Sequence, residues 1–99
     1  MKDCQGFDEV VRMIGGKWKL MILRQLIYNG VIRFNELRRS IKGISQTMLT
    51  KQLRELEQDD LLMRRVFAEV PPRVEYTATA KAKDLDQMFS AMYAWAKRH

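Results

Sequence analysis

Apolar residues recur three or four positions apart through the first half of the chain, which is the spacing of helices that bury one side. One row comprises Phe7, Val10, Val11 and Ile14, and a second comprises Trp18, Met21, Ile22 and Leu26. Gly15-Gly16 and Asn29-Gly30 follow the two rows, and such residues predict where helices end. The pattern therefore predicts two short helices, followed at residues 31–33 by no more than an edge strand.

Residues 34–56, FNELRRSIKGISQTMLTKQLREL, predict two amphipathic helices separated by a tight turn. A third helix from Asn35 to about Ile41 turns Phe34, Leu37 and Ile41 inward. After the turn, the Ser45 hydroxyl is suited to cap a fourth helix, because it can accept hydrogen bonds from free backbone amides. The buried stripe of that helix comprises Met48, Leu49, Leu53 and Leu56.

After Asp60 the pattern changes to β-forming residues around a Pro-Pro corner. Residues 62–79, LMRRVFAEVPPRVEYTAT, predict a two-stranded hairpin. Thr79 can cap one last helix that runs from Ala80 to near the C-terminus. Its predicted apolar face comprises Leu85, Met88, Phe89, Met92 and Trp95. The order of elements predicts an α+β, mostly α fold: a single winged helix-turn-helix domain over residues 1–99, with the hairpin as its wing.

The charge of the chain points to a polyanionic partner. Its 99 residues include 18 Lys and Arg against 12 Asp and Glu, a formal net charge of +6. Nucleic acid fits such a balance first and an acidic membrane surface second. The longest apolar run, residues 20–23, is too short to cross a bilayer, and the start lacks the apolar stretch of a signal peptide. A single cysteine excludes an internal disulfide, so we expect a cytoplasmic protein without a membrane partner.

The outward face of the fourth helix carries hydrogen-bond donors and cations rather than alternating charges. Opposite the leucines lie Gln46, Thr47, Thr50, Lys51 and Arg54. A helix fits the major groove of B-DNA, where such side chains reach base edges and phosphates. Ser45 and the free amides of the helix N-terminus suit a phosphate. The alternative is an ordinary solvated helix face, but the preceding turn, the hairpin and the net charge together favour double-stranded DNA.

Further cations surround this helix. Arg33, Arg38, Arg39 and Lys42 flank the third helix, where they can hold the phosphate backbone. Arg73 follows the Pro-Pro corner at the predicted wing tip, and an arginine there suits a narrow minor groove. Arg64 and Arg65 alternate across a strand, so at most one of them faces DNA. For each of these cations the alternative is ordinary surface charge.

The fourth helix ends in a cluster of carboxylates. The cluster comprises Glu55, Glu57, Asp59 and Asp60. We expect a solvated helix end that points away from phosphate, because like charges repel.

Three blocks of the chain resemble the signature of HxlR-type transcriptional regulators, a winged-helix group related to the MarR family. The blocks are GGKWKLMILRQL, RFNELRRSIKGISQTMLTKQLRELEQDDL and EVPPRVEYTAT, in the expected order. The resemblance implies a homodimeric, sequence-specific DNA-binding regulator with the 45–56 helix in the major groove and the 70–74 wing beside it. It also implies that the first and last helices form the dimer. There we expect the interface residues Phe7, Val10, Val11, Ile14, Leu85, Met88, Met92 and Trp95.

The chain departs from the family pattern at several positions. Asp60 stands where the family usually has Gly, while Ala78 and Ala82 replace a usual Leu and Gly. Some family members sense oxidants or electrophiles through an N-terminal Cys-Pro, whereas Gln5 follows Cys4 here. A helix N-terminus and a nearby lysine lower the pKa of a thiol, and nearby carboxylates raise it. Two interpretations of Cys4 remain open, a redox sensor and a plain terminal cysteine.

The residue inventory gives little support to catalysis. His99 is the only histidine and the last residue, and no metal-ligand spacing, phosphate loop or nucleophile elbow is present. We therefore expect no enzyme, no metal and no cofactor. A dimer of helices rich in Met and Trp can enclose an apolar pocket for a small-molecule effector. The alternative function is a winged-helix module for protein–protein interaction, whose binding would respond little to salt.

Overall fold

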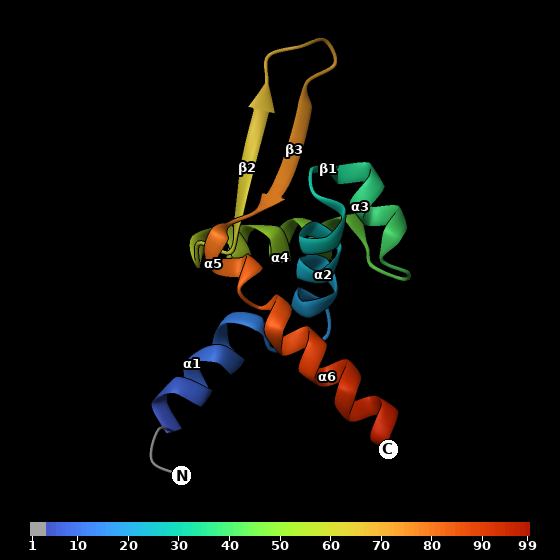
Figure 1. Ribbon diagram of the computed structural model, residues 1–99. Coiled ribbons are helices and arrows are strands. Elements are labelled where there is room, and N and C mark those ends of the chain that lie inside the picture. The colour runs from blue at the N-terminus through green and yellow to red at the C-terminus, as the bar shows by residue number, and fades with distance from the viewer. Residues whose placement is uncertain (1–3) are drawn as a thin grey trace.

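The chain folds into a helical body from which a β-hairpin projects. The computed structural model describes residues 4–99, and their side chains from Gly6 onward. The elements are α1 (Cys4–Ile14), α2 (Lys19–Asn29), β1 (Ile32–Arg33), α3 (Phe34–Ser40), α4 (Gln46–Gln58), β2 (Leu62–Phe67), β3 (Arg73–Ala78), α5 (Ala80–Lys83) and α6 (Asp86–Arg98). Figure 1 shows the hairpin at one end of the molecule, while α1 and α6 extend in diverging directions from the other. The predicted winged helix-turn-helix fold is confirmed.

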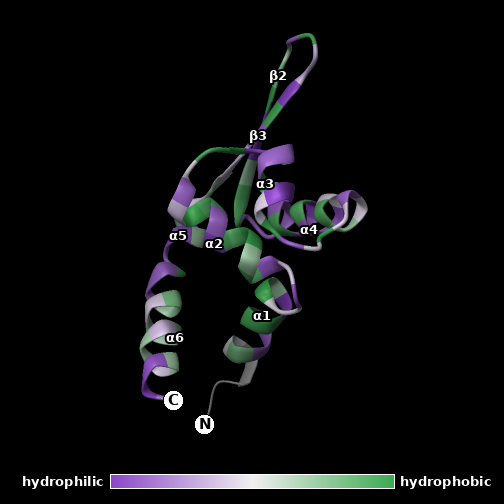
Figure 2. Cartoon of the chain, turned by 90° about the vertical axis from the view of Figure 1, so that its right-hand side faces the viewer, coloured by the Kyte–Doolittle hydropathy of each residue, from purple (hydrophilic) through white to green (hydrophobic). Residues whose placement is uncertain are grey.

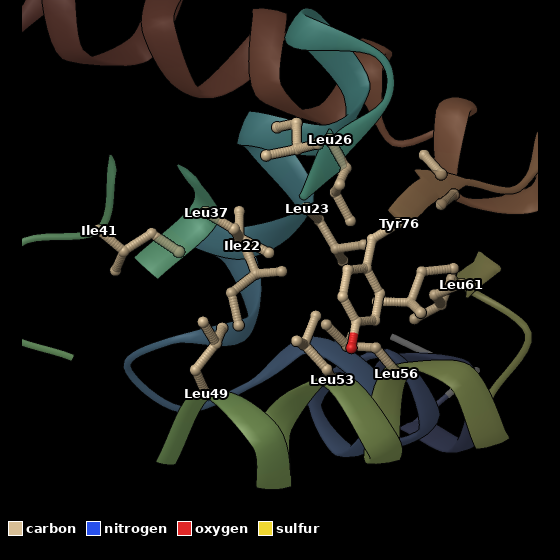
Figure 3. Close-up of a cluster of buried hydrophobic side chains, with 14 of the residues drawn as sticks. Ile22, Leu23, Leu26, Leu37, Ile41, Leu49, Leu53, Leu56, Leu61 and Tyr76 are labelled. Atoms are coloured by element: carbon tan, nitrogen blue, oxygen red, sulfur yellow. The ribbon is translucent and has the colours of Figure 1, made fainter. Parts of the chain in front are cut away.

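The core lies between α2, α3, α4 and the base of the hairpin. Leu49, Leu53 and Leu56 of α4 are at most 2% exposed, and they point toward Ile22 and Tyr76 (Figure 3). The leucine stripe predicted for the fourth helix is therefore buried, and its polar side is left outward. Burial of this stripe determines which face of α4 can meet a partner.

Both ends of α4 are closed by local hydrogen bonds. The Ser45 hydroxyl accepts from the Met48 N–H at 3.0 Å, as predicted for a cap. At the other end the Leu61 N–H donates to the Leu56 carbonyl at 2.9 Å, and the Asp60 N–H donates to the Glu57 carbonyl at 3.0 Å. These two bonds form a Schellman motif. Asp60 occupies its left-handed position with φ +60°, where glycine is the usual residue.

The three strands form an antiparallel sheet in the order β1-β3-β2. The short β1 lies at an edge, as predicted. Leu62 pairs with Ala78 at the base of the hairpin, and Phe67 pairs with Arg73 at its last register position. The wing tip is therefore the loop of residues 68–72. Arg73 lies in β3 behind this loop rather than at the tip itself.

The C-terminal segment is two helices rather than the single one predicted. Thr79 caps α5 as predicted, because its hydroxyl accepts from the Ala82 N–H at 3.2 Å. The chain then changes direction at residues 84–85 before α6 begins (Figure 1). Tyr28 of α2 donates a hydrogen bond to Asp86 in the first turn of α6 at 2.5 Å. Packing of α6 on α2 therefore accompanies a bend that the apolar spacing alone does not reveal.

The apolar residues of the two terminal helices divide between the core and the surface. Ile14 and Phe89 are 6% and 4% exposed and belong to the core, and Leu85 and Met88 pack against it. None of the helices described for residues 4–99 combines the length and apolar character that a membrane span requires.

Candidate nucleic-acid interface

The outward face of α4 is a continuous polar and basic surface. Gln46, Thr47, Lys51 and Arg54 are exposed and Thr50 is half-buried. These five side chains line one shallow hollow. The Thr50 hydroxyl donates to the Gln46 carbonyl at 2.9 Å. Because that proton is engaged, the Thr50 oxygen faces outward mainly as an acceptor, which suits an amino group on a base edge.

A crevice separates α4 from the base of the wing. It is lined by Thr50, Leu53, Arg54, Glu57, Arg64 and Tyr76. Arg64 turns into this crevice and its Nε lies 3.3 Å from Glu57 Oε1. Arg65 instead lies over the Phe67 ring, with its Cζ 4.9 Å from the ring centroid. The two arginines thus leave opposite faces of the strand, and only Arg64 lies beside α4.

Cations of α3 and the following turn form a second basic surface beside α4. Arg33, Arg38, Arg39 and Lys42 are all exposed. Arg38, Arg39 and Lys42 line a hollow next to Gly43, whose φ of +88° makes the turn between α3 and α4. Arg33 and Arg39 line a larger hollow of about 730 Å³ between α3 and the wing loop. The smaller hollow borders the turn and the larger one borders the wing loop. Arginines in such hollows are of the type that contacts phosphates.

Arg73 is not the free wing-tip cation that the sequence predicts. It begins β3, and its side chain is only 26% exposed. Its Nη1 lies 3.3 Å from Glu69 Oε1 and its Nε lies 3.4 Å from Glu75 Oε2. Its Cζ also lies 3.9 Å from the Phe67 ring centroid. The guanidinium is therefore engaged on three sides within the wing.

The acidic end of α4 pairs with other elements of the chain and is not the solvated helix end that the sequence predicts. Three of its carboxylates pair with cations from three other elements: Glu55 with Lys19 of α2 at 2.7 Å, Glu57 with Arg64 of β2 at 3.3 Å, and Asp59 with Arg12 of α1 at 3.2 Å. The Asp59 carbonyl also accepts from Lys81 Nζ at 3.0 Å. These contacts fix the C-terminal end of α4 to the rest of the fold, and none of them uses a residue of the outward polar face.

Sequence reasoning missed Lys19. Its residue exposure is 8%, and its hydrogen bond holds the pKa of Glu55 below the ordinary value. A signal was present, because Lys19 shares the helical stripe of Ile22, Leu23 and Leu26. A lysine on a buried stripe requires an anionic partner. The sequence does not reveal which carboxylate supplies it.

The free ends of α1 and α6 expose large apolar side chains. Phe7 and Val11 are 62% and 50% exposed, and Met92 and Trp95 are 48% and 60% exposed. Figure 2 shows hydrophobic segments along both helices. Of the predicted interface residues, Val10 is also exposed, whereas Ile14 is buried in the core of its own chain, with Leu85 and Met88 packed against that core. Exposed apolar area of this kind is typical of an interaction surface.

Two further predictions concern Cys4 and metal binding. Cys4 begins α1, but its side chain lies outside the described residues. Among the side chains that the structure does describe, no group of three or more His, Cys, Asp or Glu residues is placed to hold a metal ion.

Comparison with known proteins identifies the family. The model of the HxlR-like helix-turn-helix family matches residues 13–99. An HTH-type transcriptional regulator of Methanothermobacter thermautotrophicus is 47% identical over 92 residues, which are 93% of this chain and 70% of that protein. The oxidised redox regulator HypR is similar with a TM-score of 0.84 and 39% identity, over 95% of this chain and 96% of that one. Quinone-bound YodB from B. subtilis has a TM-score of 0.85 and 34% identity, over 97% and 99% of the two chains. The chain therefore belongs to the HxlR-like helix-turn-helix family of transcriptional regulators.

Proposed function

We propose that this transcriptional regulator binds an inverted repeat in double-stranded DNA as a homodimer, with α4 in the major groove. The observation that carries the proposal is the outward face of α4. Burial of Leu49, Leu53 and Leu56 leaves one face of this helix free, and that face presents Gln46, Thr47, Thr50, Lys51 and Arg54. Side chains of these types read base edges and hold phosphates.

The surfaces beside α4 suit the phosphate backbone. Arg33 caps the start of α3, Arg38 and Arg39 lie in its last turn, and Ser45 caps α4. Contacts of this kind set the register of a protein on DNA without reading sequence. They also make binding fall steeply with salt, because each neutralised phosphate releases counterions. A docking module for another protein, the alternative function, would show a shallow salt dependence. Because such a regulator acts on the chromosome, we place it in the cytoplasm.

We propose that α1 and α6 form the dimer through their exposed residues Phe7, Val10, Val11, Met92 and Trp95. A two-fold axis lets the same apolar surface of each subunit cover the other. It also relates two recognition helices to two half-sites of opposite direction, about 34–36 Å apart or a multiple of that spacing. The expected operator is therefore an inverted repeat.

Selection of bound duplexes from a random pool, followed by binding to variants, tests the major-groove face. Thr50→Ala and Arg54→Ala should weaken or relax specific binding, each by about 1–3 kcal/mol. Neither residue belongs to the leucine stripe, so the fold should persist. Lys83→Ala is the control, because it removes an exposed cation of α5 that lines neither of the two hollows along the outward face of α4. Wild-type affinity and specificity in both test variants would show that the wrong face has been assigned.

The dimer is tested by placing a charge in the proposed interface. Met92→Glu should split the dimer in light scattering and remove most of the affinity, because a single half-site binds weakly. Gln87→Glu adds the same charge to another side of α6 and should leave the dimer intact. A monomeric wild type at micromolar concentration that binds a single half-site at full strength would overturn the proposal.

We further propose that an oxidant or electrophile controls DNA binding through Cys4. It is the only cysteine of the chain, and two similar proteins are described as a redox regulator and as quinone-bound. A quinone would add to the thiolate, forming one C–S bond while the ring takes up a proton and becomes a hydroquinone. The competing control is non-covalent binding of an effector in an apolar pocket between the dimer helices. Regulation of that kind would persist in a Cys4→Ser variant, which lacks the thiol.

A further inference from the structure

The wing tip carries its own acidic residue. The loop of residues 68–72 reads Ala-Glu-Val-Pro-Pro, so Glu69 is its one charged side chain. Val70 at the same tip is fully exposed. A carboxylate this close to the duplex would repel the phosphates on either side of a groove. A wing of this sequence therefore needs a cation beside Glu69 before it can approach DNA.

Arg73 supplies that cation from inside the wing. It reaches back to Glu69 with one nitrogen and across to Glu75 with another, at 3.3 and 3.4 Å. Its Nε is buried and forms no hydrogen bond, so its contact with Glu75 is an ion pair without one. The guanidinium lies against the Phe67 ring. To turn Nη1 and Nε to a phosphate, the side chain would have to leave both carboxylates and the ring. It would also leave Glu69 uncompensated.

We propose that Arg73 is a positioning residue of the wing and not a DNA contact. It neutralises Glu69 and holds the loop against Phe67, so that the wing presents the uncharged Val70-Pro71-Pro72 tip to the minor groove. This inference rests on the proposed DNA binding. It replaces the minor-groove arginine expected from the sequence with an apolar tip, and apolar side chains are a known means of contact in that groove.

A double-mutant cycle on operator binding separates the two roles. Arg73→Ala should weaken binding by about tenfold, because it exposes Glu69 to the phosphates. In a background of Glu69→Gln the same change should have less than about a twofold effect, because the two residues are coupled. The salt dependence of binding in that background should stay unchanged. An equal loss in both backgrounds, with the salt slope reduced by about one, would identify a direct phosphate contact and overturn the inference. So would wild-type affinity in Arg73→Ala.

Arg65→Ala is the matched control. It removes the same charge from the same hairpin and also lies against Phe67, but no carboxylate among the described residues forms an ion pair with it. Its effect on binding should therefore be the same with and without Glu69→Gln. If Glu69→Gln restored DNA binding to Arg65→Ala as much as to Arg73→Ala, it would act only through the overall charge. The inference would then fail.

Hydrogen exchange in the free protein tests the same inference without DNA. The Glu69 N–H donates to the Phe67 carbonyl at 2.9 Å. If Arg73 holds the loop, exchange of this amide should accelerate in Arg73→Ala and stay unchanged in Arg65→Ala. Unchanged exchange in Arg73→Ala overturns the inference even where DNA binding is intact. Failure of the wild type to bind any selected duplex overturns the proposed function instead, and leaves the exchange result to decide the role of Arg73 in the wing.

Discussion

Replacing Asp60 by glycine should stabilise the protein. Asp60 takes φ +60° in the Schellman motif that ends α4, a conformation in which a Cβ atom is strained. Its carboxylate also lies at the C-terminal end of the helix dipole, and α4 has no basic residue in its last turn. Both effects disfavour aspartate here. The backbone hydrogen bonds of the motif do not involve the side chain, so glycine keeps them.

Three effects set the size of the gain. Relief of the left-handed strain contributes about 1 kcal/mol, toward the low end for an L-residue because aspartate tolerates this region. Removal of a carboxylate from the helix C-terminus contributes about 0.5 kcal/mol. The greater freedom of glycine in the unfolded chain opposes these by about 0.7 kcal/mol. The net gain for Asp60→Gly is about 1 kcal/mol, which for a chain of this size raises Tm by about 5 °C.

Thermal and urea unfolding at one fixed protein concentration measure the effect, since dimerisation makes stability depend on concentration. Asp60→Asn removes the charge but keeps a residue that tolerates the left-handed region, so it should gain about half as much. Asp60→Ala removes the charge but keeps the strain, so it should gain little or nothing. A glycine variant no more stable than the alanine variant would refute the reasoning, because relief of strain would then contribute nothing to the gain.

Three further predictions concern α4 and the N-terminus. Glu55→Gln leaves the Lys19 ammonium buried without its counter-ion and should lower the free energy of unfolding by about 2 kcal/mol, less than for a fully buried pair because the Glu55 side chain is 38% exposed; an unchanged urea midpoint would contradict this. Because Lys19 lowers the pKa of folded Glu55, the stabilisation from this ion pair is complete above the ordinary carboxyl pKa and is lost as pH falls through the lower folded pKa. The free energy of unfolding should therefore fall less steeply with acid in Glu55→Gln. Ser45→Ala removes the hydroxyl that caps α4 and should destabilise by about 1 kcal/mol in the same assay, whereas Ser40→Ala should have a smaller effect. Cys4→Ser should bind DNA normally but no longer release it with diamide or a quinone; equal release from wild type and variant would remove Cys4 from the mechanism.

The helices and the outward face of α4 were predictable because each depends on local spacing. The apolar rows predict helix positions close to those of α1, α2 and α4, and the Ser45 and Thr79 caps follow from side chains next to the amides that they accept from. The polar face of α4 follows directly from its leucine stripe. Glycine was expected at position 60 from the resemblance, and the left-handed φ of Asp60 is the conformation that favours glycine.

Long-range partners were not predictable from the same pattern. Arg12 meets Asp59 across 47 positions, and no local rule selects that pair. The bend before α6 occurs without Pro or Gly, and it accompanies a contact between Tyr28 and Asp86 that lie 58 positions apart. Because Arg73 directly follows two prolines, the sequence predicts it at the tip of the wing. The hairpin register, which pairs it with Phe67, withdraws it into the wing.

On the proposed binding mode, the DNA specificity of this protein would be easy to change, because the scaffold contacts and the outward face use different residues of α4. Its C-terminal half is tied to α1, α2 and β2 through Asp59, Glu55 and Glu57. The outward residues Gln46, Thr47, Thr50, Lys51 and Arg54 take no part in those contacts. A library varied at positions 46, 47, 50, 51 and 54 would therefore explore new operators on an unaltered scaffold. The same division lets duplicated genes of such a protein diverge toward different operators by few substitutions, without first having to recover a stable fold.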